Sequence, residues 1–208
     1  MSPAATRGVL TVTLGAFVAL TLAALFVGTD GIDSTVRLRL LDRASADVMA
    51  VMRVVNVAGN WKFLLPATLL LLGVFDGARR TWWVWIALMI VAPMAEGAMK
   101  QIVGRARPES AAYGFPSGHA TAAAAYFGAL VYLARDLRPS VRIVVRVAAV
   151  VMILAVGVAR VMLRAHWPSD VLGGIALGLA LASIAVLLAS GAGGHRAGRL
   201  AEHPGRRA

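Results

Sequence analysis

Long apolar runs separated by short polar segments dominate the pattern of the chain. The first run extends from Gly8 to Gly28. It is longer than the ~7–15 apolar residues of a signal-peptide core, and no A-x-A cleavage pattern follows it. Because a membrane-spanning helix needs ~20 predominantly apolar residues, the pattern predicts that this run is retained as a first transmembrane helix.

Five further spans are expected, so the pattern predicts an all-α polytopic membrane protein with six transmembrane helices. Tryptophans near the start of the third span suit a membrane–water interface. Residues 1–190 are expected to form a single six-helix membrane domain. Residues 191–208 are expected to be a basic, disordered tail, because they are rich in Gly and Arg. The further spans are expected at 61–75, 81–99, 116–133, 143–158 and 170–188.

Residues 33–55 have a different pattern, with apolar residues at helical spacing and most charged residues on the other side. This predicts an amphipathic helix after the first span, with Asp33 or Ser34 as its N-cap. Such a helix would lie in the membrane interface or, as an equal alternative, form a soluble cap packed on the bundle. A turn is expected at 56–60, which includes Gly59.

The composition supports this class, because 59% of the 208 residues are hydrophobic and only 15% are charged, an apolar fraction that soluble domains rarely reach. Cysteine is absent, which excludes disulfides, thiol nucleophiles and thiolate metal sites. The formal net charge of +11 would suggest nucleic acid as the partner of a soluble protein. Here the basic residues lie mostly in short loops and at the C-terminus, so anionic lipid and an anionic substrate are the expected partners, and nucleic acid is not.

The basic loops also predict an orientation. If the spans alternate, one side of the membrane carries eleven of the 21 Lys and Arg residues, and at least four of the others lie in the suspected site. The positive-inside rule then places the termini in the cytoplasm and the suspected site at the exterior or periplasmic face. The eleven are Arg7, Arg79, Arg80, Arg135, Arg138, Arg142, Arg146, Arg196, Arg199, Arg206 and Arg207.

Candidate chemistry is concentrated in 160–170, between two apolar runs. Asp170 follows His166 by four residues and can fix its tautomer, which leaves the other ring nitrogen available for nucleophilic attack. Arg160 can hold an anionic substrate with paired hydrogen bonds. Glu96, near the end of the third span, is expected to form a structural ion pair with the basic residues just after it.

Alternation of the spans places 100–119 on the same face as 160–170. Lys100 and Arg107 add positive charge there. Ser117 and Gly118 are expected to open a helix after Pro116 and to direct their backbone N–H groups at an anion. His119 follows directly and suits general acid–base chemistry.

Three motifs in this region resemble a known signature. Lys100-x6-Arg107-Pro108, Pro116-Ser117-Gly118-His119 and Arg160-x5-His166-x3-Asp170 are similar to the three-part signature of the type 2 phosphatidic acid phosphatase family. The resemblance implies a membrane-embedded lipid phosphatase acting on phosphatidic acid, phosphatidylglycerophosphate or a polyprenyl pyrophosphate such as undecaprenyl pyrophosphate. It places the chain in the inner, cytoplasmic membrane of a bacterium. One departure is Ala159, where the family usually has serine.

The expected mechanism follows from the same residues. His166 is expected to attack phosphorus and form a phosphohistidine, with Asp170 orienting it. His119 is expected to protonate the leaving alkoxide and then to activate water. Lys100, Arg107, Ser117, Gly118 and Arg160 are expected to hold the phosphate. No metal and no cofactor are expected, because cations take the place of a metal ion and the loops lack the acidic residues that hold magnesium.

Two other functions are kept as alternatives. A lipid phosphotransferase would use the same intermediate. An anion or lipid transporter is disfavoured, because the charges lie at span ends and no broken pair of spans repeats between the halves. Several other residues are expected to have ordinary roles: Ser169 as a helix cap, Arg105 and Arg164 as solvated charges or lipid-headgroup contacts, Gly174 and Gly178 in helix packing, and His195 and His203 in the tail with no assigned role.

Overall fold

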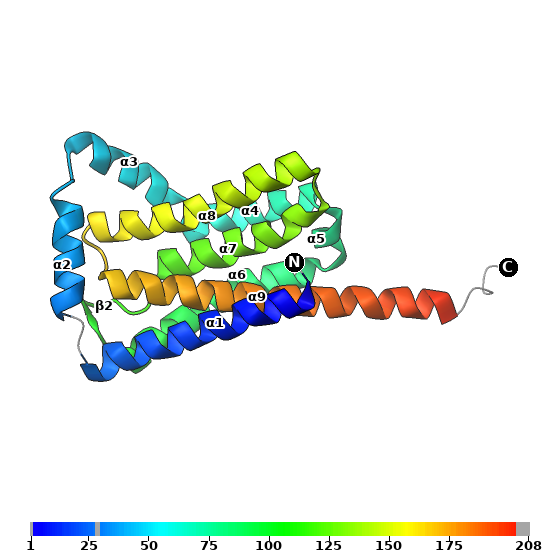
Figure 1. Cartoon of the computed structure of the whole chain (residues 1–208), viewed down its shortest axis with the longest axis horizontal. Helices are drawn as coiled ribbons and strands as arrows, with labels where there is room; N and C mark the ends of the chain where they lie inside the picture. Colours follow the sequence, from blue (N-terminus) through cyan, green and yellow to red (C-terminus); the bar gives the residue numbers. More distant parts are fainter. Residues whose placement is uncertain (1, 28–29, 203–208) are drawn as a thin grey trace.

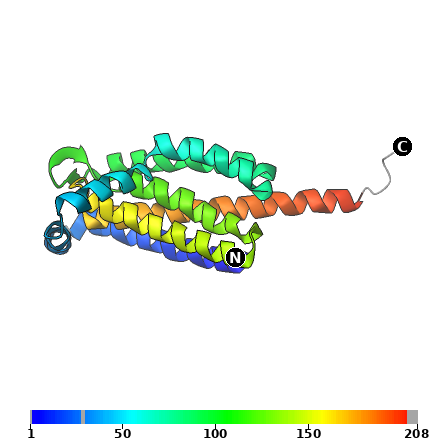
Figure 2. The same ribbon diagram turned by 90° about the horizontal axis from the view of Figure 1, so that it is seen from above.

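A bundle of helices running along one axis forms the body of the protein (Figures 1 and 2). The structure, a computed structural model, describes residues 2–27 and 30–202. A π-helical segment, Ala23–Val27, continues the first helix. The bundle helices are α1 (Pro3–Leu22), α4 (Trp61–Val74), α6 (Trp82–Val103), α7 (Gly118–Leu133), α8 (Pro139–Met162) and α9 (Pro168–Glu202).

The bundle has the lengths and the surface of an integral membrane protein. Within the described residues, four helices are long and apolar enough to cross a bilayer, or up to five if the bent pair α3–α4 counts as one span. The six spans expected from the sequence are not confirmed, because α4 has only 14 residues and α7 only 16. Large apolar side chains point outward, including Val12, Leu70 and Val144, which are 71%, 69% and 67% exposed. A lipid environment accounts for such a surface.

Helix α9 lies at the centre of the packing, against α1 and α7. A Cβ at Gly174 would lie 2.5 Å from the carbonyl oxygen of Ser117, and a Cβ at Gly178 would collide with the carbonyl oxygen of Thr121. The expected packing role of these two glycines is therefore confirmed. Buried alanines of α7 complete the contact: Ala120, Ala123, Ala124, Ala125 and Ala129. Small residues on both helices allow this close backbone approach.

The segment between the first two expected spans is not one helix. It forms α2 (Asp30–Leu41), which crosses one end of the bundle, and α3 (Ala46–Val57), which returns toward it (Figure 1). The helix breaks at 42–45, and Ser45 begins α3 by accepting a hydrogen bond from the Val48 N–H at 3.3 Å. Because Ser at an N-cap satisfies a backbone donor there, it marks a boundary that the apolar periodicity conceals.

Asp33 does not begin α2, which starts at Asp30. Its carboxylate instead accepts from the backbone N–H of Ser169 at 2.9 Å, at the start of α9. The prediction that Asp33 caps its own helix is therefore wrong. The expected turn at 56–60 is present in shorter form, since α3 continues to Val57 and α4 begins at Trp61.

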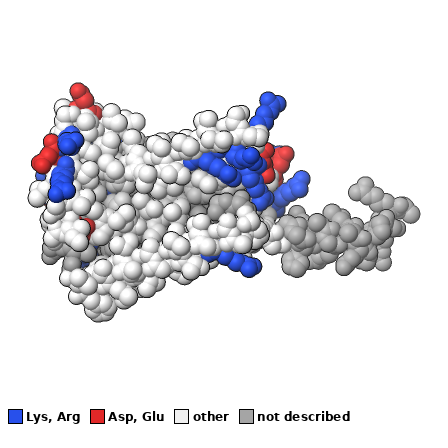
Figure 3. All heavy atoms as spheres, viewed as in Figure 1, with Lys and Arg blue, Asp and Glu red and all other residues white. Residues whose placement is uncertain are grey.

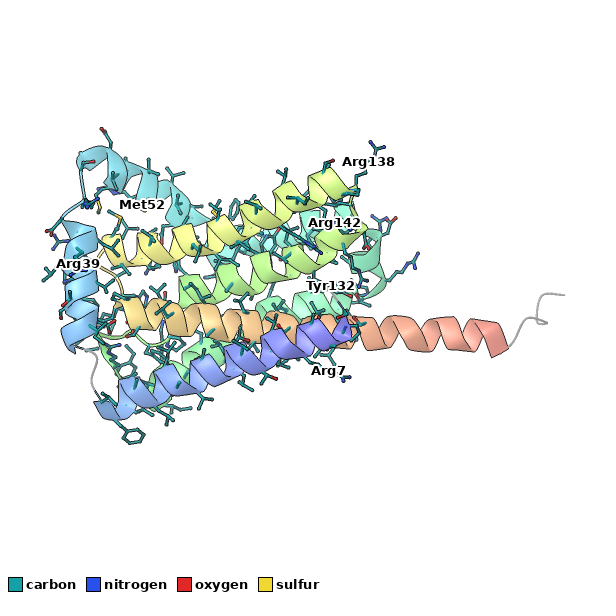
Figure 4. The ribbon with its side chains drawn as sticks, in the orientation of Figure 1. Arg7, Arg39, Met52, Tyr132, Arg138 and Arg142 are labelled. Atoms are coloured by element: carbon teal, nitrogen blue, oxygen red, sulfur yellow. The ribbon has the colours of Figure 1, made fainter. Side chains whose placement is uncertain are left out.

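Short elements complete the two ends of the bundle. The polar segment 100–115 contains an antiparallel hairpin, β1 (Ala106–Arg107) and β2 (Ser110–Tyr113), near α2. At the opposite end lie α5 (Asp76–Arg80) and the 3-10 turn η2 (Ala134–Asp136). The first and last helices both have their free ends at this second end (Figure 1). Basic side chains gather here in Figure 3, and Arg7, Arg138 and Arg142 are labelled here in Figure 4.

Helix α9 continues past Gly191 to Glu202, into the segment that is expected to form the basic tail. A helix already formed adds each further residue without a new nucleation cost. Residues 203–208, which include His203, lie outside the described part of the chain, as does the side chain of His195.

Candidate active site

A cavity of about 510 Å³ opens at the end of the bundle that α2 crosses. Apolar residues of α4 and α6 line it together with the motif residues. The lining consists of Gly59, Trp61, Leu64, Leu65, Met89, Ala92, Pro93, Glu96, Lys100, Arg107, Gly118, His119, Ala122, Arg160 and His166. The structure thus brings together six of the eight site residues that the sequence predicted, and Ser117 and Asp170 lie just behind them.

Three cations reach the cavity from three separate elements. Lys100 lies in the last turn of α6, and Arg160 lies in the last turn of α8. Arg107 comes from β1, and its Nε donates to the Tyr113 carbonyl at 3.2 Å across the hairpin. The hairpin therefore fixes the arginine of the first motif, a constraint that the sequence reading missed.

The first turn of α7 faces the same cavity through Gly118 and His119. The first hydrogen bond of this helix runs from the Thr121 N–H to the Ser117 carbonyl at 2.9 Å. The N–H groups of the preceding positions lack a partner within the helix, as at any helix start. Such donors attract an anion, and Gly118 places no side chain in front of them.

Ser117 differs from its expected role. Its N–H donates to the Asp170 carbonyl at 2.9 Å, so this group does not point at the cavity, and that prediction is wrong. Its Oγ is buried without a hydrogen-bond partner in the described part of the chain. The backbone bond instead joins the start of α7 to the start of α9.

His166 and Asp170 lie side by side at the inner end of the cavity. The Nδ1 of His166 is 3.5 Å from Oδ2 of Asp170, longer than an ordinary hydrogen bond, and this nitrogen has no hydrogen-bond partner within the described residues. The same oxygen accepts from the backbone N–H of Trp167 at 3.1 Å. Both side chains are almost completely buried. Burial lowers the pKa of His166, the contact with Asp170 opposes this shift, and the charges of Arg160 and Arg107 lower the pKa further.

A buried network supports Asp170 from behind. Arg105 donates to Oδ1 of Asp170 at 3.1 Å and to Asp33 at 2.7 Å. The Ser169 hydroxyl donates to Asp33 at 2.5 Å, and Arg105 also bonds the Ser169 oxygen at 2.6 Å. The prediction that Arg105 is a solvated charge is therefore wrong, because its side chain is mostly buried between two carboxylates.

Ser169 lies inside the first turn of α9 rather than at a cap position before it. Its backbone N–H is satisfied by Asp33, a residue 136 positions away in the sequence. No local pattern links the two residues, so the sequence reading had no signal for this contact.

The connection between α3 and α4, together with the end of α3, contacts Arg160 and His119. Asn56 Oδ1 accepts from Nη1 of Arg160 at 2.7 Å. A Cβ at Gly59 would lie 2.9 Å from the His119 carbonyl, so only glycine allows this approach. The sequence reading treated both residues as parts of a turn, although they contact two of the predicted site residues.

Two further charged residues have the positions expected for them. Glu96 forms an ion pair with Lys100 one turn later, which confirms the predicted pairing. Arg164 is exposed and pairs with Glu109 at 3.2 Å. In the described ranges, no group of three or more His, Asp, Glu or Cys side chains is arranged to hold a metal ion.

Comparisons with known proteins agree with this arrangement. The sequence profile of the PAP2 superfamily matches residues 109–192, which include the second and third motifs. Phosphatidylglycerophosphatase B of Bacillus subtilis is 31% identical over 143 residues, covering 63% of this chain and 70% of that protein. A lipid A 1-phosphatase of Rhizobium johnstonii is 32% identical over 106 residues, covering 43% of this chain and 40% of that protein.

The fold has a solved counterpart. The crystal structure of a transmembrane PAP2-type phosphatidylglycerolphosphate phosphatase from Bacillus subtilis matches with a TM-score of 0.79 at 23% identity. The match covers 88% of this chain and 96% of that one, so the two proteins share one overall fold. From its sequence relatives and this fold, the chain belongs to the PAP2 superfamily and is a membrane phosphatase of that family.

Proposed function

We propose that the protein removes a phosphate group from a membrane lipid through a phosphohistidine on His166. The observation that carries this proposal is the position of the buried His166–Asp170 pair, 3.5 Å apart, beside a cavity that three cations and His119 also line. Phosphoryl transfer requires positive charge around the equatorial oxygens and a nucleophile in line with the leaving group, and the cations and His166 line the same cavity here.

In the first step, Nε2 of neutral His166 attacks phosphorus, and the bond from phosphorus to the lipid oxygen breaks. His119 donates its proton to the departing oxygen. In the second step, His119 takes a proton from water, water attacks phosphorus, the phosphorus–nitrogen bond breaks and inorganic phosphate leaves. Burial favours neutral His166, because it lowers the pKa of the imidazole, so the nucleophile stays available at mildly acidic pH.

In this mechanism the Asp170 carboxylate, 3.5 Å from Nδ1 of His166, attracts the proton on that nitrogen and leaves Nε2 for attack. Lys100, Arg107, Arg160 and the N–H of Gly118 bind the phosphate oxygens. Ser117 contributes by fixing the start of α7 through its backbone bond to Asp170. No metal is assigned a role, because positive side chains occupy the wall where a metal enzyme would place carboxylates.

The proposal also includes the membrane and the orientation of the protein in it. The helices α1, α4, α6, α7, α8 and α9 cross the inner membrane of a bacterium, and α2 lies in the interface. The basic end with the two free helix ends faces the cytoplasm, which the positive-inside rule favours. The cavity then faces the periplasm or exterior. Reporter fusions at the C-terminus test this orientation, and a periplasmic signal would reverse it.

The substrate is a lipid phosphate whose tail lies against the apolar wall of the cavity. Trp61 and Leu65 of α4 and Met89 and Pro93 of α6 form this wall, so a lipid would enter from the bilayer between these helices. Relatives named for phosphatidylglycerophosphate and lipid A support a lipid monophosphate. Phosphatidic acid and polyprenyl pyrophosphate are the other candidates.

Phosphate release from purified protein tests the proposal. The protein in lipid nanodiscs is given phosphatidylglycerophosphate, phosphatidic acid and undecaprenyl pyrophosphate in parallel, and free phosphate is measured. Release from at least one lipid, lost in His166→Ala, is the expected result. Lipid transport without phosphate release would identify a transporter, and transfer of phosphate to another lipid would identify a phosphotransferase.

A further inference from the structure

Glu96 brings a negative charge into a cavity whose other charged lining residues are Lys100, Arg107 and Arg160. It lies on α6 one turn before Lys100, and its carboxylate pairs with the Lys100 ammonium. The side chain is only 13% exposed. Beyond this ion pair, its Oε1 has no hydrogen-bond partner among the described residues. The carboxylate is therefore held inside the cavity rather than in the surrounding water.

The carboxylate also lies against the start of α7. A Cβ at Gly118 would be 2.8 Å from Oε1 of Glu96, so the acid faces the first residue of that helix directly. The N–H groups of a first helical turn are donors for an anion. Glu96 is thus placed next to two groups that the proposed mechanism assigns to the substrate phosphate, Lys100 and the N-terminus of α7.

The charges of the cavity indicate which anion fits. Among the described lining residues, Lys100, Arg107 and Arg160 are positive, and Glu96 is the only acid. Without the two histidines, these side chains carry three positive charges minus one, or +2; the proton of His119 is not counted because it goes to the leaving oxygen. A phosphate monoester carries about −1.5 to −2 at pH 7, which matches this sum. A diphosphate carries an additional ionised phosphoryl group and would exceed it.

We propose that Glu96 makes the cavity selective for a lipid phosphomonoester over the diphosphate of the same lipid. The inference rests on the proposed lipid phosphatase function and specifies the substrate class within it. Glu96 acts by repelling the additional negative charge of a diphosphate and by offsetting, through its ion pair with Lys100, one of the three positive charges that face the phosphate. It does not touch the reacting atoms and is a specificity-determining residue.

A matched pair of lipids tests the proposal. Phosphatidic acid and diacylglycerol pyrophosphate with the same acyl chains differ only in the number of phosphoryl groups. Wild type is expected to have the higher kcat/KM for phosphatidic acid. Glu96→Gln keeps the size of the side chain and removes its charge, and it is expected to raise the diphosphate-to-monophosphate ratio of kcat/KM about tenfold, the order expected when one nearby like charge is removed.

Two control variants separate this local effect from others. Glu109→Gln removes an acid from the same end of the bundle, but Glu109 pairs with Arg37 and Arg164 and does not line the cavity. It is expected to leave the ratio unchanged. Glu96→Asp keeps the charge and is expected to retain the wild-type preference. The same rise in Glu109→Gln as in Glu96→Gln, or an unchanged ratio in folded Glu96→Gln, overturns the proposal.

A binding measurement does not depend on turnover. Isothermal titration measures the affinity of wild type and of Glu96→Gln for inorganic phosphate and for inorganic pyrophosphate. The substitution is expected to raise the affinity for pyrophosphate more than the affinity for phosphate. If no lipid is hydrolysed but this difference is present, the proposed function fails and the charge selectivity stands. Wild type alone also provides a test, because a higher kcat/KM for the diphosphate lipid, or tighter binding of pyrophosphate than of phosphate, contradicts the proposal.

Discussion

The two ends of the bundle both contain a pocket with arginines, but they differ in how the charges are balanced. At the basic end, Arg80 and Arg135 line a pocket together with Asp76 and Asp136. At the other end, Lys100, Arg107 and Arg160 share the cavity with Glu96 alone among the acids of the described residues. The number of arginines therefore does not distinguish the ends, whereas the uncompensated charge does.

The charge balance at each end determines which arginines are available to a ligand. The ion pairs Arg79–Asp76 and Arg135–Asp136 are exposed, and exposed pairs contribute little energy. Their role is consistent with membrane orientation. Around the active-site cavity, the helices hold positive groups close together with one acid among them, which is stable only near an anion or water. An excess of cations in a cavity thus identifies a phosphate site better than a basic surface does.

The largest expected effect comes from replacing the two histidines of the active-site cavity. His166→Ala removes the nucleophile, and His119→Ala removes the acid–base group. General acid–base catalysis is worth about 10²–10⁴-fold, so His119→Ala should lose that much in kcat, and His166→Ala at least as much. Phosphate release from a lipid monophosphate measures both. A folded His166→Ala protein with near-normal kcat would rule out the mechanism.

A second experiment compares the two ends directly on α8. Arg160→Ala removes a cavity cation near the end of this helix, whereas Arg138→Ala removes an exposed arginine directly before its start. Loss of one preorganised donor to a transition-state anion costs about 10²–10³-fold in kcat. Arg160→Ala is expected to lose this much and Arg138→Ala less than about twofold, because surface charges away from a site have small effects. Equal losses would remove the distinction between the ends.

A third experiment tests whether Asp33 positions Asp170 through Arg105 and Ser169. Asp33→Asn removes the charge that holds Arg105 and the Ser169 hydroxyl. Hydrogen bonds to charged groups are worth about 1.5–3 kcal/mol, so kcat is expected to fall about ten- to hundredfold with little change in KM. Asp42→Asn, at an exposed position just after α2, is the control. A loss of thermal stability with unchanged kcat would show that Asp33 supports the fold but does not position Asp170.

The smallest expected effect comes from replacing Ala159 with the serine that the family usually has at this position. Ala159 is completely buried beside Arg160. Two side chains that could replace the serine contact have other partners, because the Thr121 hydroxyl donates to the Ser117 carbonyl at 3.0 Å and Arg164 pairs with Glu109. A neutral hydrogen bond is worth about 0.5–1.5 kcal/mol, so Ala159→Ser should raise kcat/KM roughly two- to tenfold. An unchanged or lower value in a folded variant means that the contact is already replaced.

The sequence was most informative where a short stretch carries its own chemistry. Lys100, Arg107, Gly118, His119, Arg160 and His166 were predicted from three motifs, and all of them line one cavity. The packing of Gly174 and Gly178 and the pairing of Glu96 with Lys100 were also predicted correctly, because each depends on spacing within one helix.

The contacts that the sequence did not predict join residues that are far apart along the chain. Asp33 contacts Ser169, and Asn56 contacts Arg160, but periodicity within α2 and α3 carries no information about either partner. The break between these helices was hidden because apolar residues continue with the same period across it. Arg105 was misread for a related reason: an arginine between two motif positions looks solvated until its two carboxylate partners are placed.

Trapping the phosphoenzyme tests the central claim most directly. The protein is mixed with a lipid carrying a ³²P-labelled phosphate, quenched in denaturing alkali, in which phosphohistidine survives, and digested for mass spectrometry. Label on His166, absent in His166→Ala and removed by acid, is the predicted result. Rapid hydrolysis of the lipid with no labelled protein in the first turnover, or label on another residue, would contradict a phosphohistidine mechanism at His166.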